Sequence, residues 1–266
     1  MPHPLSHGSI GSPFIELQSV DSTNNYALER VHAGLASHGA AFFSHEQVAG
    51  KGQRGKTWVA EKNSSLILSV VIKPAALSLT QQFQLSACAA VSVYEFFCQY
   101  AGDETTIKWP NDLYWQDRKA GGVLIENVVS SGQSAPSSVI GHQPSSGWQW
   151  AVIGMGININ QPAFDPGLKN PVSLRQITGK EFDTMALAKE LCFILEKNYR
   201  DLVEKGFDQI YRAYNDHLYK KGQLVRFKKG SRSFEATVQK VTEQGTLLVQ
   251  HSIEEEFNWG EVEWII

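Results

Sequence analysis

The segment Gly50–Lys56 reads Gly-Lys-Gly-Gln-Arg-Gly-Lys and brings glycines and basic side chains together. Glycine lets backbone N–H groups approach a bound anion closely, and the basic side chains supply the attracting charge. Because the whole chain has a formal net charge of -3, it has no general attraction for nucleic acids or anionic membranes. The segment therefore predicts a local anion-holding loop, and the alternative is an exposed basic hairpin tip without a ligand.

The glycine spacing of this loop also matches three nucleotide-binding patterns. The Gly-x-Gly-x-x-Gly of a dinucleotide fold needs a following helix and an acidic residue about twenty positions later, but the chain continues through Trp58 into an expected β-segment. A protein-kinase loop needs His-Arg-Asp and Asp-Phe-Gly motifs, which the sequence lacks. A Walker loop, matched by Gly50 and Gly55-Lys56-Thr57, needs a helix after it, and none is predicted. All three interpretations are disfavoured.

Further chemistry-bearing residues follow in two downstream segments. Lys108–Asp112 reads Lys-Trp-Pro-Asn-Asp, and its proline predicts a sharp turn that presents the Asn-Asp pair at one end of a sheet. Lys119 stands just before Gly121-Gly122, where a backbone without side chains can approach a ligand. The segment Gly154–Asn158 again places glycines in an expected strand before an amide. Each feature alone is explained by a turn or a bulge.

The elements that position these residues follow from hydrophobic periodicity and turn residues. Strands are expected at 14–17, 40–47, 66–72, 105–109, 112–116, 121–129 and 148–159. Helices are expected at 22–35, 80–100, 184–205 and 207–218, and a Ser- and Gly-rich loop at 130–147. Short alternating segments at 223–229, 232–241, 246–250 and 256–265 predict a β appendage. Because strands and helices are mixed without strict alternation, the expected class is α+β and not a doubly wound parallel sheet.

Composition restricts the class of protein further. No run of eighteen apolar residues is present, and the N-terminus lacks a signal-peptide pattern, so neither a membrane span nor secretion is expected. Cys88, Cys98 and Cys192 are odd in number and lie in apolar helical patterns. They predict reduced core cysteines of a cytoplasmic protein, not disulfides or metal ligands.

Taken together, the motifs resemble those of the biotin–protein ligases over nearly the whole chain. The resemblance rests on Asp-Ser-Thr-Asn from Asp21, the glycine-rich loop, Lys-Trp-Pro-Asn-Asp, Asp-Arg-Lys-x-x-Gly from Asp117, Gly-x-Gly-Ile-Asn from Gly154, and the small C-terminal β region. Five motifs in this order are specific, although each alone is not. The related lipoate ligases share the catalytic fold, but their Arg-Arg-x-Ser-Gly-Gly-Gly signature is absent here.

The resemblance implies a fold and a division of the chain. A class II synthetase-like biotin/lipoate ligase domain, a mixed sheet with flanking helices, is expected at 13–219. A small SH3-like β-barrel is expected at 220–266, and a disordered tail at 1–12. Some family members carry a helix-turn-helix domain and repress genes, but about a dozen residues before the first strand are too few for one, so no DNA binding is expected. The resemblance allows a homodimer, on which the sequence is silent.

The resemblance also implies a reaction. Family enzymes activate biotin with ATP to biotinoyl-5′-adenylate and then pass biotin to a lysine of the carrier domain of a biotin-dependent carboxylase, here of the acetyl-CoA carboxylase type. Mg²⁺ is expected with the nucleotide phosphates, without a dedicated protein metal site. The alternatives are a lipoate or octanoate ligase of the same fold and a non-catalytic biotin-binding regulator.

Residue roles carry over by position. The residues expected to bind biotin are Ser22, Thr23, Asn24, Gln47, Lys51, Gly52, Gln53, Lys119 and Gly122. The residues expected to bind ATP are Arg54, Lys56, Trp58, Asn111, Lys119 and Asn158, with the Trp58 indole available to adenine. The expected catalytic residues are Lys119, which neutralises charge between carboxylate and phosphate, with Lys51, and Asp112, which accepts a proton from or orients the incoming lysine. Helix capping is the alternative role for Ser22 and Thr23.

The loop departs from the family pattern at two positions. Many bacterial members have arginine where this chain has Lys51 and Gln53. Lysine keeps the charge without the bidentate fork, and Gln53 removes a charge that family enzymes use to retain the adenylate. We expect Lys56 or Arg54 to substitute in part, or the intermediate to leak more readily.

Overall fold

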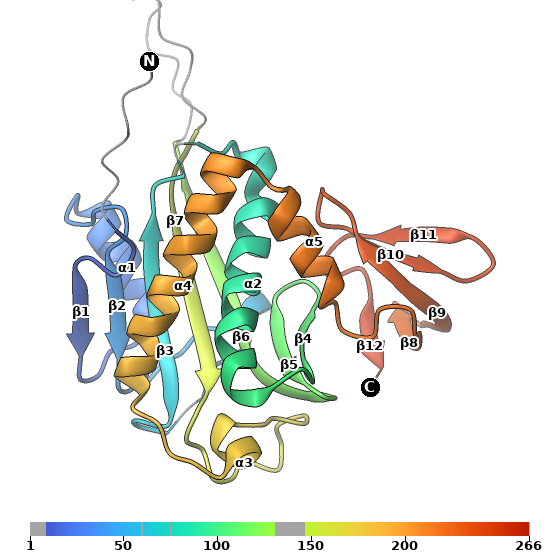
Figure 1. Cartoon of the computed structure of the whole chain (residues 1–266), viewed down its shortest axis with the longest axis horizontal. Coiled ribbons are helices and arrows are strands. Elements are labelled where there is room, and N and C mark those ends of the chain that lie inside the picture. The colour runs from blue at the N-terminus through green and yellow to red at the C-terminus, as the bar shows by residue number, and fades with distance from the viewer. Residues whose placement is uncertain (1–8, 60, 75, 131–146, 266) are drawn as a thin grey trace, which may run out of the picture.

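The structure is a computed structural model that describes residues 9–59, 61–74, 76–130 and 147–265 (Figure 1). A mixed sheet with flanking helices forms the larger part, and an antiparallel sheet follows at the C-terminal end. The predicted α+β class is thus confirmed. None of the helices in the described residues is long and apolar enough to cross a membrane.

The larger sheet has seven strands in the order β1-β2-β3-β7-β6-β5-β4. Their bounds are β1 Phe14–Leu17, β2 Ala41–Ser44, β3 Ser65–Ile72, β7 Trp148–Asn158, β6 Arg118–Val129, β5 Asp112–Trp115 and β4 Thr105–Lys108. The pair β1–β2 is parallel, and the other neighbours are antiparallel. The long strands β7 and β6 therefore lie next to each other near the middle of this sheet.

Helices cover both faces of this sheet. In Figure 1, α2 (Gln82–Ala101) and α4 (Thr184–Lys205) lie across one face, and they share a buried apolar cluster with alternate residues of β3 such as Leu66 and Leu68. On the opposite face, α1 (Thr23–His32) packs Ala27 against Val71 of β3. Because successive strand residues point to opposite faces, the whole of β3 is buried, which explains its unbroken apolar run.

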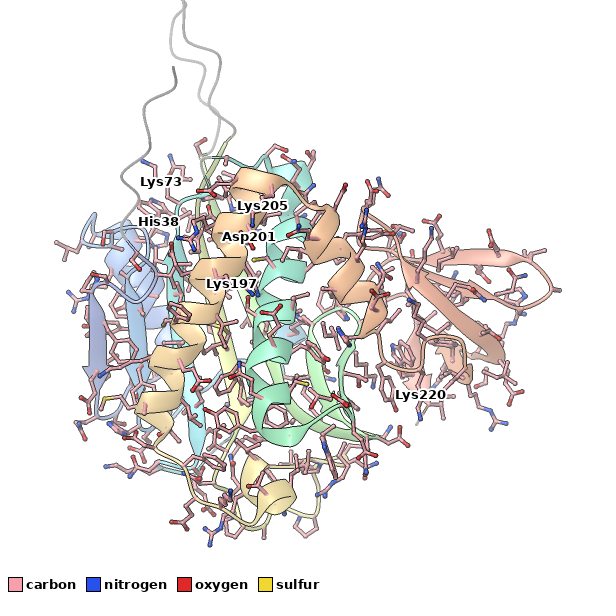
Figure 2. All side chains as sticks on the ribbon, in the orientation of Figure 1. His38, Lys73, Lys197, Asp201, Lys205 and Lys220 are labelled. Atoms are coloured by element: carbon pink, nitrogen blue, oxygen red, sulfur yellow. The ribbon has the colours of Figure 1, made fainter. Side chains whose placement is uncertain are left out.

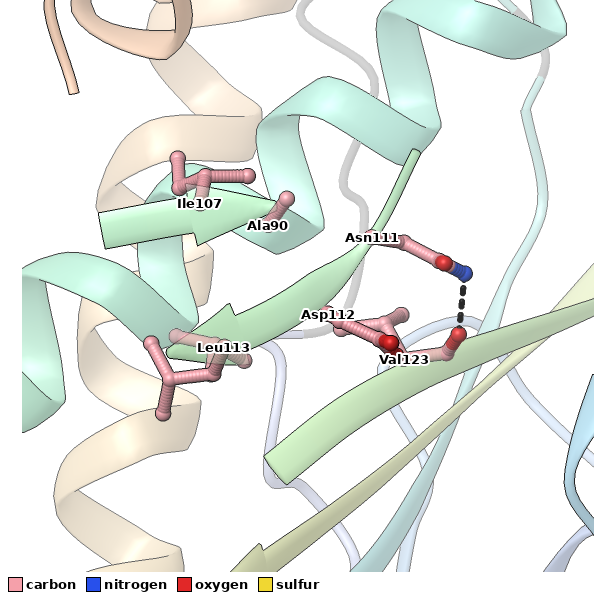
Figure 3. A pocket seen from close by; sticks show the side chains of 7 residues that line it. Ala90, Ile107, Asn111, Asp112, Leu113 and Val123 are labelled. Carbon is pink, nitrogen blue, oxygen red and sulfur yellow. Dashed lines mark hydrogen bonds between the residues drawn. The ribbon is translucent and has the colours of Figure 1, made fainter. Parts of the chain in front are cut away.

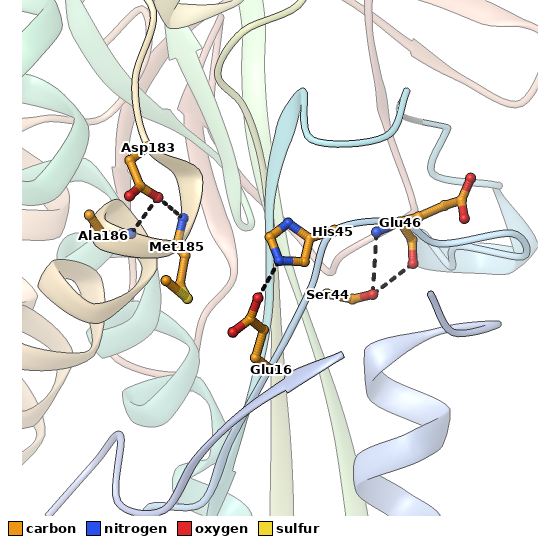
Figure 4. Close-up of polar contacts among 7 residues, drawn as sticks. All are labelled: Glu16, Ser44, His45, Glu46, Asp183, Met185 and Ala186. Carbon is orange, nitrogen blue, oxygen red and sulfur yellow. Dashed lines mark hydrogen bonds and ion pairs between the residues drawn. The ribbon is translucent and has the colours of Figure 1, made fainter. Parts of the chain in front are cut away.

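Local polar contacts fix the ends of these elements. Asp183 accepts hydrogen bonds from Met185 N and Ala186 N at 2.9 and 3.1 Å and thereby begins α4 (Figure 4). On the outer side of the same helix, Lys205 pairs with Asp201 at 2.8 Å (Figure 2). Such a capping carboxylate satisfies N–H groups that the first helical turn leaves without partners, which explains why the prediction for 184–205 matches the observed bounds.

The second sheet has five antiparallel strands in the order β11-β10-β9-β8-β12. Their bounds are β8 Leu224–Lys229, β9 Arg232–Val241, β10 Leu247–Gln250, β11 Glu254–Phe257 and β12 Glu263–Ile265. This sheet contacts the larger part through α5 (Asp208–Asp216), where the amide of Asn215 bonds both the N–H and the carbonyl of Val241 at 2.7 and 3.1 Å. Trp109 Nε1 also donates to Gly245 O at 2.9 Å.

Three expectations for the elements were wrong. The segment expected as one strand at 256–265 divides into β11 and β12, because Gly260 has a φ of +88° and Asn258 O accepts from Glu261 N at 3.1 Å, which makes a turn. Strand β6 begins at Arg118, earlier than expected, because it pairs with β5 from that residue. The short helix α3 (Leu174–Thr178), begun by a capping box at Ser173, was missed.

The expected disordered tail at 1–12 was partly wrong as well. Ile10 is buried in the main apolar cluster, and its N–H donates to Glu196 Oε2 at 2.8 Å. Gly11 N donates to Gly39 O at 2.8 Å. Residues 1–8, and 131–146 of the expected loop, lie outside the described residues. Cys88 and Cys192 are buried, as predicted, whereas Cys98, also expected in the core, is only partly buried.

Candidate active site

Polar side chains gather over the glycines of β6 and β7. The Lys119 ammonium donates to Asp112 Oδ1 at 2.6 Å, and both side chains are about one-third exposed. Gly122 lies directly opposite Asp112 in the sheet, and a Cβ atom placed on it would lie 3.0 Å from that Oδ1. The missing side chain at Gly122 therefore makes room for the ion pair.

The start of α1 supplies a second polar group. Thr23 donates both its N–H and its hydroxyl to Gln47 Oε1, at 2.7 and 3.1 Å. Gln47 follows a turn in which the Ser44 hydroxyl bonds the carbonyl and N–H of Glu46 at 2.7 and 3.3 Å (Figure 4). Ser22 is buried at the N-cap position of α1 but makes no side-chain capping bond. The side chains of Ser22 and Thr23 therefore do not cap helix α1 in this structure, and the capping alternative is not supported.

The side chain of Asn24 packs against Gly154 of strand β7. Its Nδ2 donates to Glu126 Oε2 at 2.8 Å, and its Oδ1 accepts from Ser69 Oγ at 2.6 Å. A Cβ atom on Gly154 would lie 2.2 Å from Asn24 Oδ1. Only glycine fits there while Asn24 keeps this position.

Ser69 and Glu126 belong to this polar group, and the sequence analysis did not assign them. The Ser69 hydroxyl also lies 2.7 Å from Thr23 Oγ1, and Glu126 Oε1 lies 3.7 Å from Lys51 Nζ. The sequence contained a pattern that could have identified both residues. Ser69 is a polar residue in the buried run of β3, and Glu126 shares the strand face of Gly122 by period-two alternation.

The glycine-rich loop folds as a tight hairpin. Gly52 N donates to Lys56 O at 2.6 Å, Trp58 N donates to Gly50 O at 2.8 Å, and Lys51 bridges Thr57. A single 3-10 turn spans Gln53–Gly55, and the part of 56–64 that the structure describes contains no helix. The Walker interpretation therefore lacks its helix, as expected. The next strand, β3, begins at Ser65 and not near Trp58.

The tip of the loop meets the Lys-Trp-Pro-Asn-Asp turn. Gln53 Nε2 donates to Val123 O at 3.3 Å, and Asn111 Nδ2 donates to the same oxygen. Figure 3 shows the Asn111 bond beside a small pocket that Asp112 and Leu113 also line. These contacts bring two of the predicted motifs together on β6.

Trp58 packs flat on strand β7. A Cβ atom on Gly156 would lie 2.8 Å from Trp58 Cε2, so this glycine is the platform for the indole. The indole Nε1 is buried and has no hydrogen-bond partner among the described residues. A buried N–H without a partner is costly, so it is a donor available to a ligand acceptor.

Asn158 holds the segment that carries Lys119. Its Nδ2 donates to Val172 O at 3.1 Å and reaches Lys119 O at 3.4 Å. Val172 N donates in turn to Lys119 O at 2.9 Å. This buried amide therefore holds the Lys119 segment, and the nucleotide contact expected of Asn158 stays a prediction. Lys56 is exposed, and the Arg54 side chain lies outside the described part.

Lys108 occupies an aromatic cage between the two sheets. Its ammonium lies 4.5 Å from the centre of the Tyr114 ring, 5.6 Å from that of Trp264 and 5.8 Å from that of Tyr219. It also donates to the Tyr114 hydroxyl at 3.1 Å. Burial is the largest effect on this amine and lowers its pKa to about 8.

Comparison with known proteins assigns the family of the larger part. Residues 16–143 match the model of the biotin/lipoate A/B protein ligase family. The chain carries a biotin/lipoate ligase family domain. The match contains the glycine-rich loop, the Lys108–Asp112 turn and Lys119.

Curated relatives of this family cover most of the chain. It is 28% identical over 244 residues to the bifunctional ligase/repressor BirA of Bacillus spizizenii, which covers 91% of this chain and 70% of that protein. It is 29% identical over 240 residues to the biotin–acetyl-CoA-carboxylase ligase of Paracoccus denitrificans, covering 88% and 92% of the two chains. The solved biotin protein ligase of Aquifex aeolicus in complex with biotin and ATP superposes with a TM-score of 0.75 at 25% identity, covering 94% and 97%.

Proposed function

We propose that the chain is an ATP-dependent biotin–protein ligase that forms biotinoyl-5′-adenylate and transfers biotin to a lysine of a carrier domain of the acetyl-CoA carboxylase type. The observation that carries the proposal is the Lys119–Asp112 pair at 2.6 Å over Gly122, beside a buried polar group at the start of α1. The named relatives support the same activity, because they include a biotin–acetyl-CoA-carboxylase ligase.

In this proposal the polar group at α1 binds the head of biotin. The ureido ring of biotin needs hydrogen-bond donors and acceptors. In the polar group at the start of α1, Gln47 Nε2 and the Ser22 hydroxyl have no hydrogen bond within the described residues, so both are free to bind the ring. Thr23, Asn24 and Ser69 are bonded to one another and hold the wall of the site. Lys51, Gly52 and Gln53 close over the biotin carboxylate.

Lys119 acts where the carboxylate meets the α-phosphate. Its ammonium stabilises the negative charge that the carboxylate oxygen brings to phosphorus in the transition state. Asp112 accepts a hydrogen bond from that ammonium, and in this proposal it also orients the carrier lysine. Trp58 offers its free indole N–H and ring to the nucleotide.

Mg²⁺ would supply further charge neutralisation on the nucleotide phosphates. Among the described residues no three His, Cys, Asp or Glu side chains are grouped to hold a metal ion. The site therefore fits an ion that binds with the nucleotide, not a resident one. The free cysteines agree with the proposed cytoplasmic location.

The test is biotin-dependent exchange of labelled pyrophosphate into ATP, which needs no carrier protein. Lys119→Ala is expected to lower the exchange rate by about 10²–10³-fold, because one preorganised donor to the transition state is lost. Lipoate in place of biotin is the substrate control. Exchange with lipoate but not biotin would contradict the proposal in favour of a lipoate ligase, and binding of biotin without any exchange would indicate a regulator.

A further inference from the structure

Glu126 lies on the same strand face as Gly122, but toward the other end of the candidate site. The two residues are four positions apart on β6, and successive strand residues alternate between faces, so both face the same side. At about 3.4 Å per residue they are roughly 13 Å apart. A Cβ atom on Gly122 would lie 3.7 Å from Lys119 Nζ, so Lys119 marks one end of this face and Glu126 marks the end beside α1.

One carboxylate oxygen of Glu126 orients the Asn24 side chain. Glu126 Oε2 accepts a hydrogen bond from Asn24 Nδ2 at 2.8 Å, and Asn24 Oδ1 accepts one from Ser69 Oγ at 2.6 Å. Asn24 and Ser69 are buried. An ionised carboxylate only accepts hydrogen bonds, so it fixes the amide with its NH2 group toward Glu126 and its oxygen toward Ser69. Glu126 therefore sets the direction of the hydrogen bonds in this wall of the site.

The other carboxylate oxygen holds Lys51 of the glycine-rich loop. Glu126 Oε1 lies 3.7 Å from Lys51 Nζ, and the two side chains are 29% and 43% exposed. An ion pair with this much solvent contact contributes little to stability, so Lys51 is exchanged readily to a second carboxylate. In the proposed function Lys51 closes over the biotin carboxylate, which lies toward Lys119. Lys51 must then leave Glu126 when biotin binds.

We infer that Glu126 is a positioning residue of the biotin site; this inference rests on the proposed ligase function. One of its oxygens fixes the Asn24 amide, and the other retains Lys51 at the α1 end until the carboxylate of the ligand replaces it. An anionic ligand then binds at the cost of one existing ion pair. A neutral ligand of the same shape does not engage Lys51 and leaves that pair intact, so the charge of the ligand separates the two roles.

Glu126→Gln tests the retention of Lys51. The glutamine carbonyl still accepts from Asn24 Nδ2, but the charge that faces Lys51 is gone. In titration calorimetry of the full chain, the Kd for biotin should fall about threefold, the size expected of an exposed ion pair. The Kd for biotinamide, the neutral carboxamide of biotin, should stay unchanged. A purely structural role of Glu126 would not distinguish these two ligands.

Glu61→Gln is the matched control for the loss of charge. Glu61 is exposed, follows the glycine-rich loop in the sequence and forms no ion pair within the described residues. The variant has the same net charge as Glu126→Gln. It should bind biotin and biotinamide as wild type does, and an equal gain in biotin affinity in both variants would overturn the inference.

Glu126→Ala tests the orientation of Asn24. Alanine leaves Asn24 Nδ2 without this acceptor, so the Kd values for biotin and biotinamide should both rise about tenfold. Unchanged binding of biotinamide by this variant would overturn the orienting role.

A double-mutant cycle with Lys51→Ala separates retention of Lys51 from simple charge repulsion. Without Lys51 there is no pair to break, so Glu126→Gln should no longer strengthen biotin binding in this background. A threefold gain that persists would show that Glu126 acts by repelling the biotin carboxylate directly, and the inference would be wrong.

The possible results also separate this inference from the function beneath it. If wild-type protein binds biotin and Glu126→Gln leaves the Kd for biotin unchanged or raises it, the retention of Lys51 is wrong and the ligase function stands. If wild-type protein neither binds biotin in calorimetry nor exchanges pyrophosphate in its presence, both proposals fail.

Discussion

Gln53 and Asn111 donate their side-chain amides to the same backbone oxygen, that of Val123. The glycine-rich loop is thereby attached to β6 at the point where the Lys-Trp-Pro-Asn-Asp turn is attached. The two motifs are distant in sequence, and this carbonyl makes them one site. The loop is therefore held by a neutral amide at a position where many bacterial members of the family are expected to have arginine.

Gln53→Arg is expected to slow the release of the adenylate. Arginine keeps N–H donors for Val123 O and adds a charge that attracts the adenylate phosphate. The measurement is the labelling of a lysine-rich protein without a carrier domain, in the presence of biotin and ATP. The variant should label it more slowly, while labelling of a carrier domain is retained.

The exposed Gln223→Arg adds the same charge just before strand β8 of the second sheet and serves as control. Equal labelling by wild type and Gln53→Arg would remove the case for leakage through an uncharged loop.

Gly154→Ala is expected to destabilise the site by displacing Asn24. The added Cβ would lie 2.2 Å from Asn24 Oδ1, so the amide must leave its bonds to Ser69 and Glu126. Loss of buried hydrogen bonds predicts a fall of about 2 kcal/mol in the free energy of unfolding. Biotin affinity, measured by titration calorimetry, should fall about tenfold or more.

A double-mutant cycle isolates this contact. Asn24→Ala removes the amide that the new methyl group meets, so Gly154→Ala should cost less in the Asn24→Ala background. Gly167→Ala, on an exposed turn near only the end of a flexible Asp165 side chain, should leave stability within about 0.5 kcal/mol of wild type. Additive effects of Asn24→Ala and Gly154→Ala would contradict the proposed contact.

The order of elements was readable from the sequence because it depends on local signals. The apolar spacing of 184–205, its capping Asp183 and the following Gly206 define α4 without tertiary information. The α+β class followed from the same signals. By contrast, Ile10 gave only a single apolar residue in a polar stretch, and its place in the apolar cluster and its N–H bond to Glu196 of α4 are long-range contacts.

The composition of the candidate site was only partly readable. Sequence motifs marked Gly154 and Gly156, but which side chain each glycine accommodates depends on how α1 and the loop fold back onto β7. Asn158 was predicted to contact nucleotide from its motif alone, whereas the bond of its amide to the Lys119 segment is set by long-range packing and could not be read from the sequence. The roles of Ser69 and Glu126 required the same three-dimensional information.

Trp109→Phe is expected to loosen the second sheet from the larger part. The indole N–H that donates to Gly245 O at 2.9 Å is lost, and the smaller ring leaves space in a buried position. The free energy of unfolding should fall by about 2 kcal/mol. Hydrogen exchange of the backbone amides of 224–265 should become faster.

Trp115→Phe is the matched control for that variant. Its indole N–H donates to Ala101 O at 3.1 Å, inside the larger part, so a similar hydrogen bond is lost without touching the second sheet. Exchange of 224–265 should then stay as in wild type. Equal acceleration in both variants would show that Trp109 has no specific role in attaching the second sheet.

Lys108→Met is expected to change how stability depends on pH. Burial lowers the pKa of Lys108 from 10.5 to about 8 in the folded state. Between these values the unfolded chain binds a proton that the folded chain has released, so the stability of wild type rises with pH across this window and is lowest below it. The methionine side chain has no ammonium group to titrate, so the variant avoids the free-energy cost of burying a charged amine at neutral pH.

The variant should therefore be more stable than wild type at pH 7, and its advantage should shrink by on the order of 3 kcal/mol by about pH 10.5. Asp112 acts against the lowered pKa, while Lys119, Lys169 and Lys56 add to it. Burial raises the pKa of Tyr114 and Tyr219, so both hydroxyls stay protonated in the folded protein between pH 8 and 10.5.

Urea unfolding at several pH values provides the measurement, with the exposed Lys240→Met as control. A stability difference between wild type and Lys108→Met that does not vary from pH 7 to 10.5 would contradict a desolvated amine at this position.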